Sequence, residues 1–398
     1  MYDINALRQN EFPHSNHQIY FNHASISPLP ERTRRKMGWA VDQLARNPSR
    51  FWQTEGMPMA ESLKAALAAL INATDPEEIV PVTTTSAGIN ALAQAIDWQP
   101  DDNIAFCEME FPSNAYPWLS LNGPHGLEVR QVTAVDGGLT LAELKKKVDA
   151  DTRLVAASAI QFFSGHRTDL MEIGRFCHER DILFVVDAIQ AIGHMSIDVQ
   201  AMHIDVLVSG GQKSILAPPG IGFMYVRREL AETLRPRAIG PNATVDFLHW
   251  LNYDLTPLPA AQRFNSGTPN LVGLFGLHES VGLLQTLGVA HIDQHTRHLA
   301  AVACEQLTAQ GYELVTPYED GQAPGPIVTF RSPLDNEATD ALVAHLAAQE
   351  AVVVKHLDPP GNPYIRLSFH AYNTLAEVAC FMEMLAEGKG CILQKAIN

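Results

Sequence analysis

Short runs of β-branched and other apolar residues alternate with helical patterns between about residues 79 and 226. The strand-like runs include IVPVTTT, NIAFCEM, RLVAASAI, ILFVVDAI, IDVLVSG and GFMYV, and the helical segments between them include SAGINALAQAI and LMEIGRFCHER. This alternation predicts βαβ units and therefore an α/β domain with a mostly parallel central sheet. Ligands of such sheets bind at the carboxyl ends of the strands, which is where we expect a functional site.

The pattern changes after the proline-rich stretch at 256–259. A long helical region at 270–310 is followed by the strand-like runs IVTFR, VVVKHL and YIRLSF and by helical patterns from Asn336 and Thr374. This order predicts a smaller α+β C-terminal domain. The predicted parts are an N-terminal segment at 1–20 that packs on the small domain, a large ligand-binding domain at 21–262, and a linker helix with the small domain at 263–398.

Composition argues against several kinds of partner. The 44 acidic and 28 basic side chains give a formal net charge of -16, which repels a phosphate backbone, so no nucleic-acid partner is expected. No apolar run reaches the ~18 residues of a membrane span, so no membrane association is expected. The five cysteines form no CxxC pair, which fits neither a disulfide framework nor a zinc site and favours a reducing cytoplasm. The charged fraction of 18% is low and favours an oligomer.

Two ionisable residues follow apolar strand-like runs. Asp187 ends ILFVVDAIQ, and Lys213 follows IDVLVSG in a segment rich in glycine and proline. Asp187 could instead cap the next helix, whereas Lys213 is poorly explained as a solvated surface charge. Neither a Walker A motif nor GxGxxG is present, so nucleotide binding has little support. A lysine that forms a Schiff base and an aspartate that keeps a pyridine nitrogen protonated are what pyridoxal phosphate requires.

Two further segments fit such a cofactor. TTTSAGIN at 83–90 places hydroxyl groups where a strand passes into a helix, whose N-terminal amides attract a phosphate. Alternatively, Thr85 or Ser86 simply caps that helix. Phe111, in EMEFPSNAYPW, could cover the face of a pyridine ring, although an aromatic residue at a strand end is more often part of the core.

Taken together, the chain resembles the class V aminotransferases of pyridoxal-phosphate fold type I, a group that includes cysteine desulfurases, kynureninase and isopenicillin N epimerase. The resemblance covers nearly the whole chain and is carried by YFNHASISPLP, TTTSAGIN, EFPSNAYPW, VVDAIQAIGH, DVLVSGGQKSILAPPGIGFMYV, RFNSGTPN and YIRLSFHAYNT. It implies a large domain that binds the cofactor and a homodimer with shared active sites.

The resemblance also implies roles for individual residues. They are Lys213 for the Schiff base, Asp187 for the pyridine nitrogen, Gln190 for the ring phenolate oxygen, Phe111 for stacking on the ring, Thr85, Ser86 and Ser209 for the phosphate, Thr268 for the phosphate of the neighbouring subunit, and Gln161 for a position near cofactor and substrate.

Arg366 and His23 are the predicted substrate-binding residues. Arg366 stands where family members hold the substrate carboxylate, and a guanidinium binds a carboxylate through two hydrogen bonds. The alternative is a strand arginine paired with a surface acid. His23 lies in a loop that borders the substrate pocket of relatives, with a turn or helix-capping role as its alternative.

The chain departs from the family pattern in three places. Desulfurases carry a cysteine shortly before the substrate arginine, but residues 340–364 contain none, which disfavours a reaction through a protein persulfide. Gln212 stands where many relatives have a histidine before the lysine. Phe111 replaces the ring-stacking histidine of desulfurases, as in kynureninase-like members.

No metal site is predicted. His291, His295 and His298 fall on one helical face, but HExxH is absent and no carboxylate or cysteine ligand is suggested nearby, so a solvated helix face is the better interpretation.

The sequence therefore predicts a pyridoxal-phosphate enzyme acting on a small amino acid, with aminotransferase as the main reading. The alternatives are a Cβ-eliminating lyase of the C–S lyase or kynureninase type and an epimerase, because these reactions share the same residues around the cofactor. A non-catalytic binding protein is disfavoured because both Lys213 and Asp187 are present, and a nucleotide-dependent oxidoreductase lacks its glycine-rich fingerprint.

Overall fold

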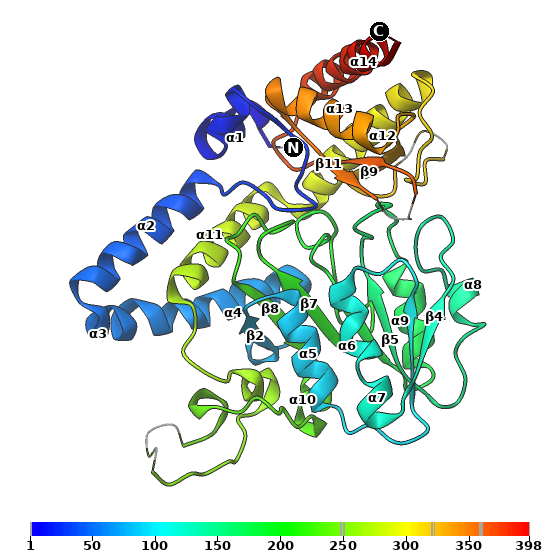
Figure 1. The fold of residues 1–398 in the computed structure, drawn as a ribbon. Helices are drawn as coiled ribbons and strands as arrows, with labels where there is room; N and C mark the ends of the chain where they lie inside the picture. Colours follow the sequence, from blue (N-terminus) through cyan, green and yellow to red (C-terminus); the bar gives the residue numbers. More distant parts are fainter. Residues whose placement is uncertain are drawn as a thin grey trace.

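A computed structural model describes residues 2–246, 249, 251–319, 321, 323–357 and 361–397. Figure 1 shows a larger part around a central sheet and a smaller part formed by the C-terminal helices and a second sheet. The predicted α/β fold, with a mostly parallel sheet and a smaller α+β domain, is confirmed.

The central sheet has seven strands in the order β2-β8-β7-β6-β5-β3-β4. Only β8 runs antiparallel to its neighbours β2 and β7. Every residue of β3, β6, β7 and β8 is buried, so these strands appear in the sequence as continuous apolar runs. The strands are β2 (Ile79–Val82), β3 (Asn103–Cys107), β4 (Glu128–Val132), β5 (Thr152–Ser158), β6 (Leu183–Asp187), β7 (Val206–Gly210) and β8 (Gly222–Val226).

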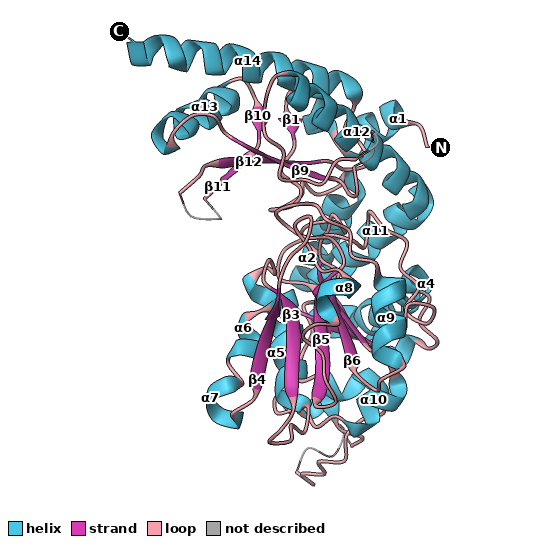
Figure 2. Cartoon of the chain, turned by 90° about the vertical axis from the view of Figure 1, so that its right-hand side faces the viewer, coloured by secondary structure: helices cyan, strands magenta, loops and turns pink. Residues whose placement is uncertain are grey.

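Helices surround this sheet, as Figure 2 shows with the strands in magenta. Those of the larger part are α2 (Glu31–Arg46), α3 (Pro48–Phe51), α4 (Met57–Ile71), α5 (Thr85–Ala95), α6 (Tyr116–Leu119), α7 (Asn122–His125), α8 (Leu141–Leu144), α9 (Leu170–His178), α10 (Arg228–Thr233) and α11 (Leu271–Leu287).

The predicted helical region at 270–310 consists of two helices. Helix α11 packs on α2 and α4 of the larger part, whereas α12 (Val289–Ala309) contacts α14 (Leu375–Ile397) of the smaller part. Gly288 separates them with a φ of 79°, a conformation that glycine adopts without a steric penalty. The chain therefore changes domain at this glycine.

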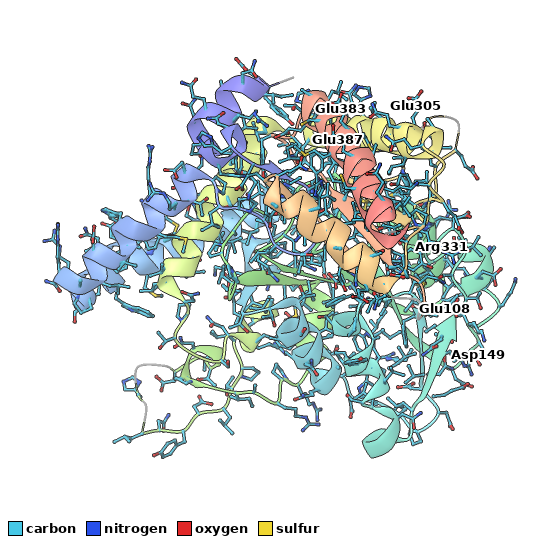
Figure 3. All side chains as sticks on the ribbon, turned by 45° about the horizontal axis from the view of Figure 1, so that its top comes forward. Glu108, Asp149, Glu305, Arg331, Glu383 and Glu387 are labelled. Carbon is cyan, nitrogen blue, oxygen red and sulfur yellow. The ribbon has the colours of Figure 1, made fainter. Side chains whose placement is uncertain are left out.

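The smaller part contains a three-stranded antiparallel sheet in the order β11-β12-β9. Its strands are β9 (Ile327–Arg331), β11 (Val354–His356) and β12 (Tyr364–Ser368), and its further helix is α13 (Asn336–Ala348). Exposed carboxylates stand on α12 and α14, among them Glu305, Glu383 and Glu387, which Figure 3 labels. They contribute to the negative charge of the chain.

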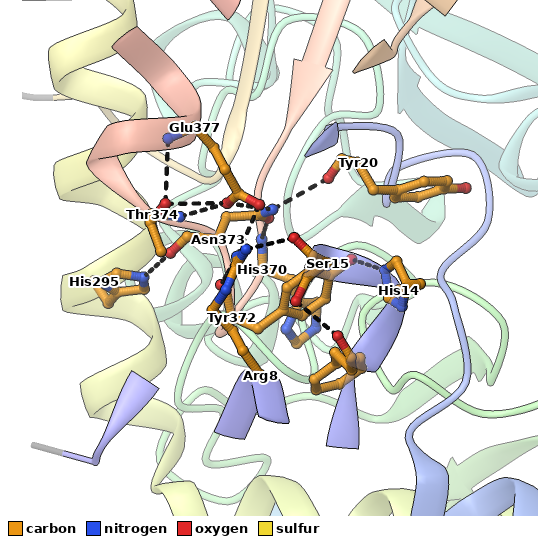
Figure 4. Close-up of polar contacts among 11 residues, drawn as sticks. Arg8, His14, Ser15, Tyr20, His295, His370, Tyr372, Asn373, Thr374 and Glu377 are labelled. Atoms are coloured by element: carbon orange, nitrogen blue, oxygen red, sulfur yellow. Dashed lines mark hydrogen bonds and ion pairs between the residues drawn. The ribbon is translucent and has the colours of Figure 1, made fainter. Parts of the chain in front are cut away.

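The N-terminal segment contacts this smaller part. It contains α1 (Ile4–Glu11) and β1 (Ile19–Tyr20), and β1 pairs in parallel with β10 (Ala351–Val352). The Arg8 guanidinium donates to the Tyr372 carbonyl at 3.0 Å and to the Glu377 carboxylate at 2.7 Å, as Figure 4 shows. Among the described residues, no helix is both long and apolar enough to cross a membrane.

Candidate active site

Lys213 and Asp187 are brought together by two neighbouring strands. Asp187 is the last residue of β6, where it pairs with Val208 of β7, and Lys213 is the third residue after the end of β7. Both side chains are buried. Burial lowers the pKa of the Lys213 amine to about 8, with a further contribution from the positive charge of Arg366, while Asp187 opposes the change. About a tenth of this amine is therefore neutral, and hence nucleophilic, at pH 7, far more than for an ordinary lysine.

Asp187 does not cap a helix, so the alternative interpretation of this residue is wrong. Its carboxylate accepts a hydrogen bond from the Ile189 amide at 2.9 Å, and the residues that follow form turns. Burial raises the pKa of Asp187 to about 6, although the Ile189 amide and Lys213 act in the opposite direction. A buried carboxylate with so few donors is stabilised by a cation. A protonated pyridine nitrogen meets that need.

The start of α5 forms a cradle for an anion. Its N-cap is Thr84, whose side chain accepts from the Ala87 amide, so the interpretation of Thr85 or Ser86 as the cap is wrong. The Thr85 hydroxyl oxygen accepts from the Gly210 amide at 2.9 Å, and the Ser86 hydroxyl lies 2.7 Å from that of Ser113. Hydroxyl groups of Thr85, Ser86 and Ser113 thus lie beside the end of β7, where the amides of α5 point outward.

The structure corrects the prediction for Ser209. Its hydroxyl is fully buried in β7 and donates to the Gly210 carbonyl, so it is not presented to an anion beside α5. Side chains alternate along a strand, and it is Gly210 that faces α5: a Cβ on Gly210 would lie 3.3 Å from the Thr85 hydroxyl and 2.7 Å from Gln212 Oε1. Gln212 is a residue of the cradle that the sequence analysis missed as a ligand. Its position directly before Lys213 was the available signal.

An aromatic wall lies beside the lysine. The Lys213 Nζ is 5.1 Å from the ring centroid of Phe111, which is 38% exposed and therefore available to cover a planar ligand. Phe162 meets Phe111 edge to face at 5.1 Å. This arrangement agrees with the stacking role predicted for Phe111.

Gln161 and Gln190 are both buried near these groups. Gln161 donates to Glu110 at 2.9 Å, and its Oε1 is buried without a hydrogen-bond partner. Gln190 donates one amide hydrogen to the Ala24 carbonyl at 2.9 Å. Because an amide nitrogen carries two hydrogens, the second remains for a ligand atom such as a ring oxygen.

Glu110 is a second residue that the sequence analysis missed. Its carboxylate accepts from the Ser158 amide at 2.7 Å and from Asn114 at 3.1 Å in addition to Gln161. Burial raises its pKa to about 7 despite these donors, and Asp187 contributes in the same direction. Like Asp187, it follows an apolar strand, which was the signal in the sequence.

Arg366 is buried in the middle of β12 and is not paired with a surface acid, so that alternative is wrong. It donates to the Phe162 carbonyl at 2.8 Å and to the Ser25 hydroxyl at 2.7 Å. In the part of the chain that the structure describes, no carboxylate forms an ion pair with it, and its Nε is buried without a partner. Its positive charge is therefore available for an anionic substrate group.

The structure places His23 in a turn, which is the alternative interpretation of this residue. Its ring is 2% exposed and packs against Tyr20, His370 and Tyr372, and its Nδ1 lies 2.9 Å from the Ser27 hydroxyl. These contacts lie behind the main chain of Lys213, since Ser27 donates to the Lys213 carbonyl. The structure thus gives His23 buried protein contacts in place of a substrate contact.

The three histidines of α12 form no ligand set. His291 and His298 are exposed, while His295 lies 2.9 Å from the Asn373 carbonyl. Within the described ranges, no group of three or more histidine, cysteine, aspartate or glutamate side chains is suited to hold a metal ion.

Thr268 is exposed and belongs to the segment before α11, not to the strands and turns that carry Asp187 and Lys213. Together with Thr83, it lines a cavity of about 320 Å³ beside α5. This exposed position is compatible with the predicted contact to a neighbouring subunit.

The family model described as Aminotransferase class-V matches residues 19–381. The chain belongs to the class V aminotransferase family. The predicted family is thereby confirmed. A probable cysteine desulfurase from Methanothermobacter thermautotrophicus is 31% identical over 94% of this chain and 95% of its own length.

Solved structures give the same fold. The apo cysteine desulfurase from Thermococcus onnurineus NA1 has a TM-score of 0.86 at 26% identity, covering 98% of this chain and 99% of the other. The cystine C–S lyase C-DES, solved with its product cysteine persulfide, has a TM-score of 0.84 at 21% identity, covering 95% and 99%. A C-DES variant carries glycine covalently linked to its pyridoxal-phosphate cofactor.

The residues gathered here fit pyridoxal phosphate. The hydroxyl cradle at α5 suits its phosphate, Phe111 its ring face, Asp187 its ring nitrogen and Lys213 its aldehyde. Two buried polar atoms that lack partners, Gln161 Oε1 and Arg366 Nε, are further groups that a cofactor with a bound amino acid would satisfy.

Proposed function

We propose that this member of the family is a pyridoxal-phosphate C–S lyase that acts on cysteine or cystine. The observation that carries the proposal is that a buried Lys213 with a lowered pKa occurs together with a buried Arg366, for which the described residues provide no carboxylate partner. One group can handle the α-proton of an amino acid while the other binds its α-carboxylate. The bound cofactor supplies a charged ring that withdraws electrons from the α-carbon.

Each side chain has one task in this proposal. Arg366 binds the substrate carboxylate and is itself held by Phe162 and Ser25. The neutral amine of Lys213 removes the α-proton, because its lowered pKa makes it a base at neutral pH. Asp187 keeps the ring nitrogen charged. The Cβ–S bond then breaks with its electron pair leaving on sulfur, and water releases the remaining carbon skeleton as pyruvate and ammonia.

Two observations support elimination over transamination, the main reading from the sequence. The relatives described above are named for reactions at the sulfur of cysteine or cystine, and one of them, C-DES, is named a cystine C–S lyase. In this chain the five cysteines lie outside 340–364, and Cys107, Cys177 and Cys304 are buried thiols. With no thiol before Arg366 to take up sulfur, the sulfur leaves on the departing fragment.

The test is product analysis with the purified protein and added pyridoxal phosphate. With cystine or cysteine as substrate we expect pyruvate and ammonia in equal amounts, together with a persulfide or sulfide. Alanine as the product indicates desulfuration and contradicts the proposal. A requirement for a 2-oxo acid as amino acceptor indicates transamination and contradicts it as well. K213A is the control for background release by free cofactor.

We also propose a homodimer with shared sites. The exposed Thr268 and the cavity that it lines beside α5 support this assembly. Sedimentation should give the mass of two chains, and T268A should weaken cofactor binding without changing the fold. A monomer with full cofactor affinity contradicts this part of the proposal.

A further inference from the structure

Three buried histidines lie behind the lysine, and the proposed reaction uses none of them. The ring centroids of His23 and His194 are 5.3 and 4.4 Å from that of His370. All three side chains are at most 3% exposed. Burial lowers the pKa of each, that of His370 to about 4, so the three rings are neutral at neutral pH.

The hydrogen bonds of His370 allow one neutral tautomer. Its Nε2 lies 3.0 Å from the Ser214 carbonyl, which can only accept, so Nε2 carries the proton. Its Nδ1 accepts from the Ala371 amide at 2.8 Å and therefore carries none. His370 thus donates to the main chain of the residue after Lys213.

A second chain of hydrogen bonds starts at His23. The Ser27 hydroxyl donates its one proton to the Lys213 carbonyl at 2.8 Å. His23 Nδ1, 2.9 Å from that hydroxyl, must then be the donor to it. The Ser27 amide also donates to the Gln212 carbonyl at 2.8 Å. Ser27, in the loop before α2, therefore binds the main-chain carbonyls of both Gln212 and Lys213.

The turn after Asp187 makes a third set of contacts with the chain beside Lys213. The Ser214 hydroxyl donates to the Ile189 carbonyl at 2.8 Å. A Cβ on Gly193 would lie only 2.0 Å from the Ser214 carbonyl and 3.3 Å from His370 Nε2, so only glycine allows this approach. The main chain at 213–214 is therefore contacted by Ser27, Gly193 and His370.

We propose that His23, Ser27 and His370 are positioning residues that hold the main chain of Lys213 and Ser214, and thereby keep the lysine amine buried beside Asp187. Ser27 and His370 bond the main chain at 213–214 directly, His23 acts through the Ser27 hydroxyl, and the structure shows no hydrogen bond between any of the three and the Lys213 amine. The proposal requires Lys213 to be the reactive amine, but it holds for any reaction of the family and does not depend on C–S cleavage.

The experiment measures the Lys213 amine in the protein without cofactor. Its rate of acylation, read by mass spectrometry of the peptide that contains it, is recorded against pH for the wild type, S27A, H370N and H370Q. Asparagine can replace only the Nδ1 acceptor of His370, whereas glutamine can replace its Nε2 donor. We expect S27A and H370N to raise the pKa of the amine towards 10.5, because a looser main chain admits water. At pH 8, the first unit of increase slows acylation about five-fold and the second unit slows it about nine-fold more.

The matched control is H295N. His295 is partly buried and, like His370, contacts a carbonyl, that of Asn373 at 2.9 Å. The structure shows no hydrogen bond between it and residues 212–214. We expect H295N and H370Q to keep the wild-type pH profile of acylation. The proposal is overturned if S27A and H370N lower the melting temperature while their acylation profiles match that of H295N, or if H370Q behaves as H370N does. If H370N does not fold, the acylation profile of S27A alone tests the proposal. These measurements test the positioning proposal even if the protein does not catalyse C–S cleavage.

Discussion

The ionisable residues of the site are buried, and burial shifts the pKa values of their acids and of their amine in opposite directions. It makes an acid weaker and an amine less basic, so Asp187 and Glu110 have raised pKa values while that of Lys213 is lowered. At neutral pH the free protein therefore holds carboxylates whose charge is costly until a cation arrives. The stability of the free protein and its affinity for a cationic ligand are linked through these groups.

Replacing Asp187 by asparagine should stabilise the cofactor-free protein at high pH. The folded pKa of about 6 exceeds the ordinary 3.8, so the native state binds more protons than the unfolded chain, and stability falls as pH rises through this interval. D187N removes this loss, worth about 3 kcal/mol above pH 7. Thermal unfolding should show the variant more stable than the wild type at pH 8, and equally stable at pH 4. Equal melting temperatures at both pH values would refute the prediction.

Replacing Arg366 by lysine should impair substrate binding and leave cofactor binding unchanged. Lysine keeps the charge but loses the planar pair of donors, as well as the fit to Phe162 and Ser25. We expect KM to rise by about ten-fold or more, since a hydrogen bond to a charged group contributes about 1.5–3 kcal/mol. Titration with cofactor should give the wild-type affinity. A lower cofactor affinity with unchanged KM would place Arg366 at the cofactor instead.

At the scale of elements, neighbouring residues at the start of α5 have different roles: one stabilises the helix and another lines the predicted ligand site. Thr84 caps the helix, whereas Ser86 contacts Ser113 and lines the cradle. We expect T84A to cost about 1 kcal/mol of stability through loss of the cap. S86A should change stability little and weaken binding of pyridoxal phosphate. Denaturant unfolding and cofactor titration of both variants provide the check, and the opposite pattern would show that the roles are exchanged.

Buried elements could be predicted from the sequence because continuous apolar runs leave few alternatives. The strands that end at Asp187 and Gly210 are examples, and the positions of Lys213 and Asp187 followed from them. Ser209 was misplaced because a shift of one residue along a strand moves a side chain to the opposite face. His23 was misplaced because nothing in a loop sequence shows which side of the lysine its ring will take. Glu110 was missed because its donors Ser158 and Gln161 come from a distant segment of the chain.

At the scale of the whole molecule, the N-terminal segment depends on Arg8 for its attachment. The guanidinium of Arg8, in α1, donates to Glu377 of α14, to the Tyr372 carbonyl before α14 and to the Ser15 carbonyl after α1 (Figure 4). We expect R8M to cost about 2 kcal/mol, because charged hydrogen bonds are lost at a mostly buried site. Limited proteolysis should then cut the first twenty residues faster than in the wild type, with R34M, whose pair with Glu31 is exposed, as the control. Equal cutting rates would refute the prediction.

The strand that carries Arg366 continues into His370, which is bonded to the chain beside Lys213. Arg366 and Lys213 thus belong to one framework although they come from different domains. A rigid swing of the C-terminal domain would rupture that link and disturb the amine at the same moment. We therefore expect an incoming amino acid to be admitted by local rearrangement around the entrance, while the two halves of the molecule keep their mutual orientation throughout turnover.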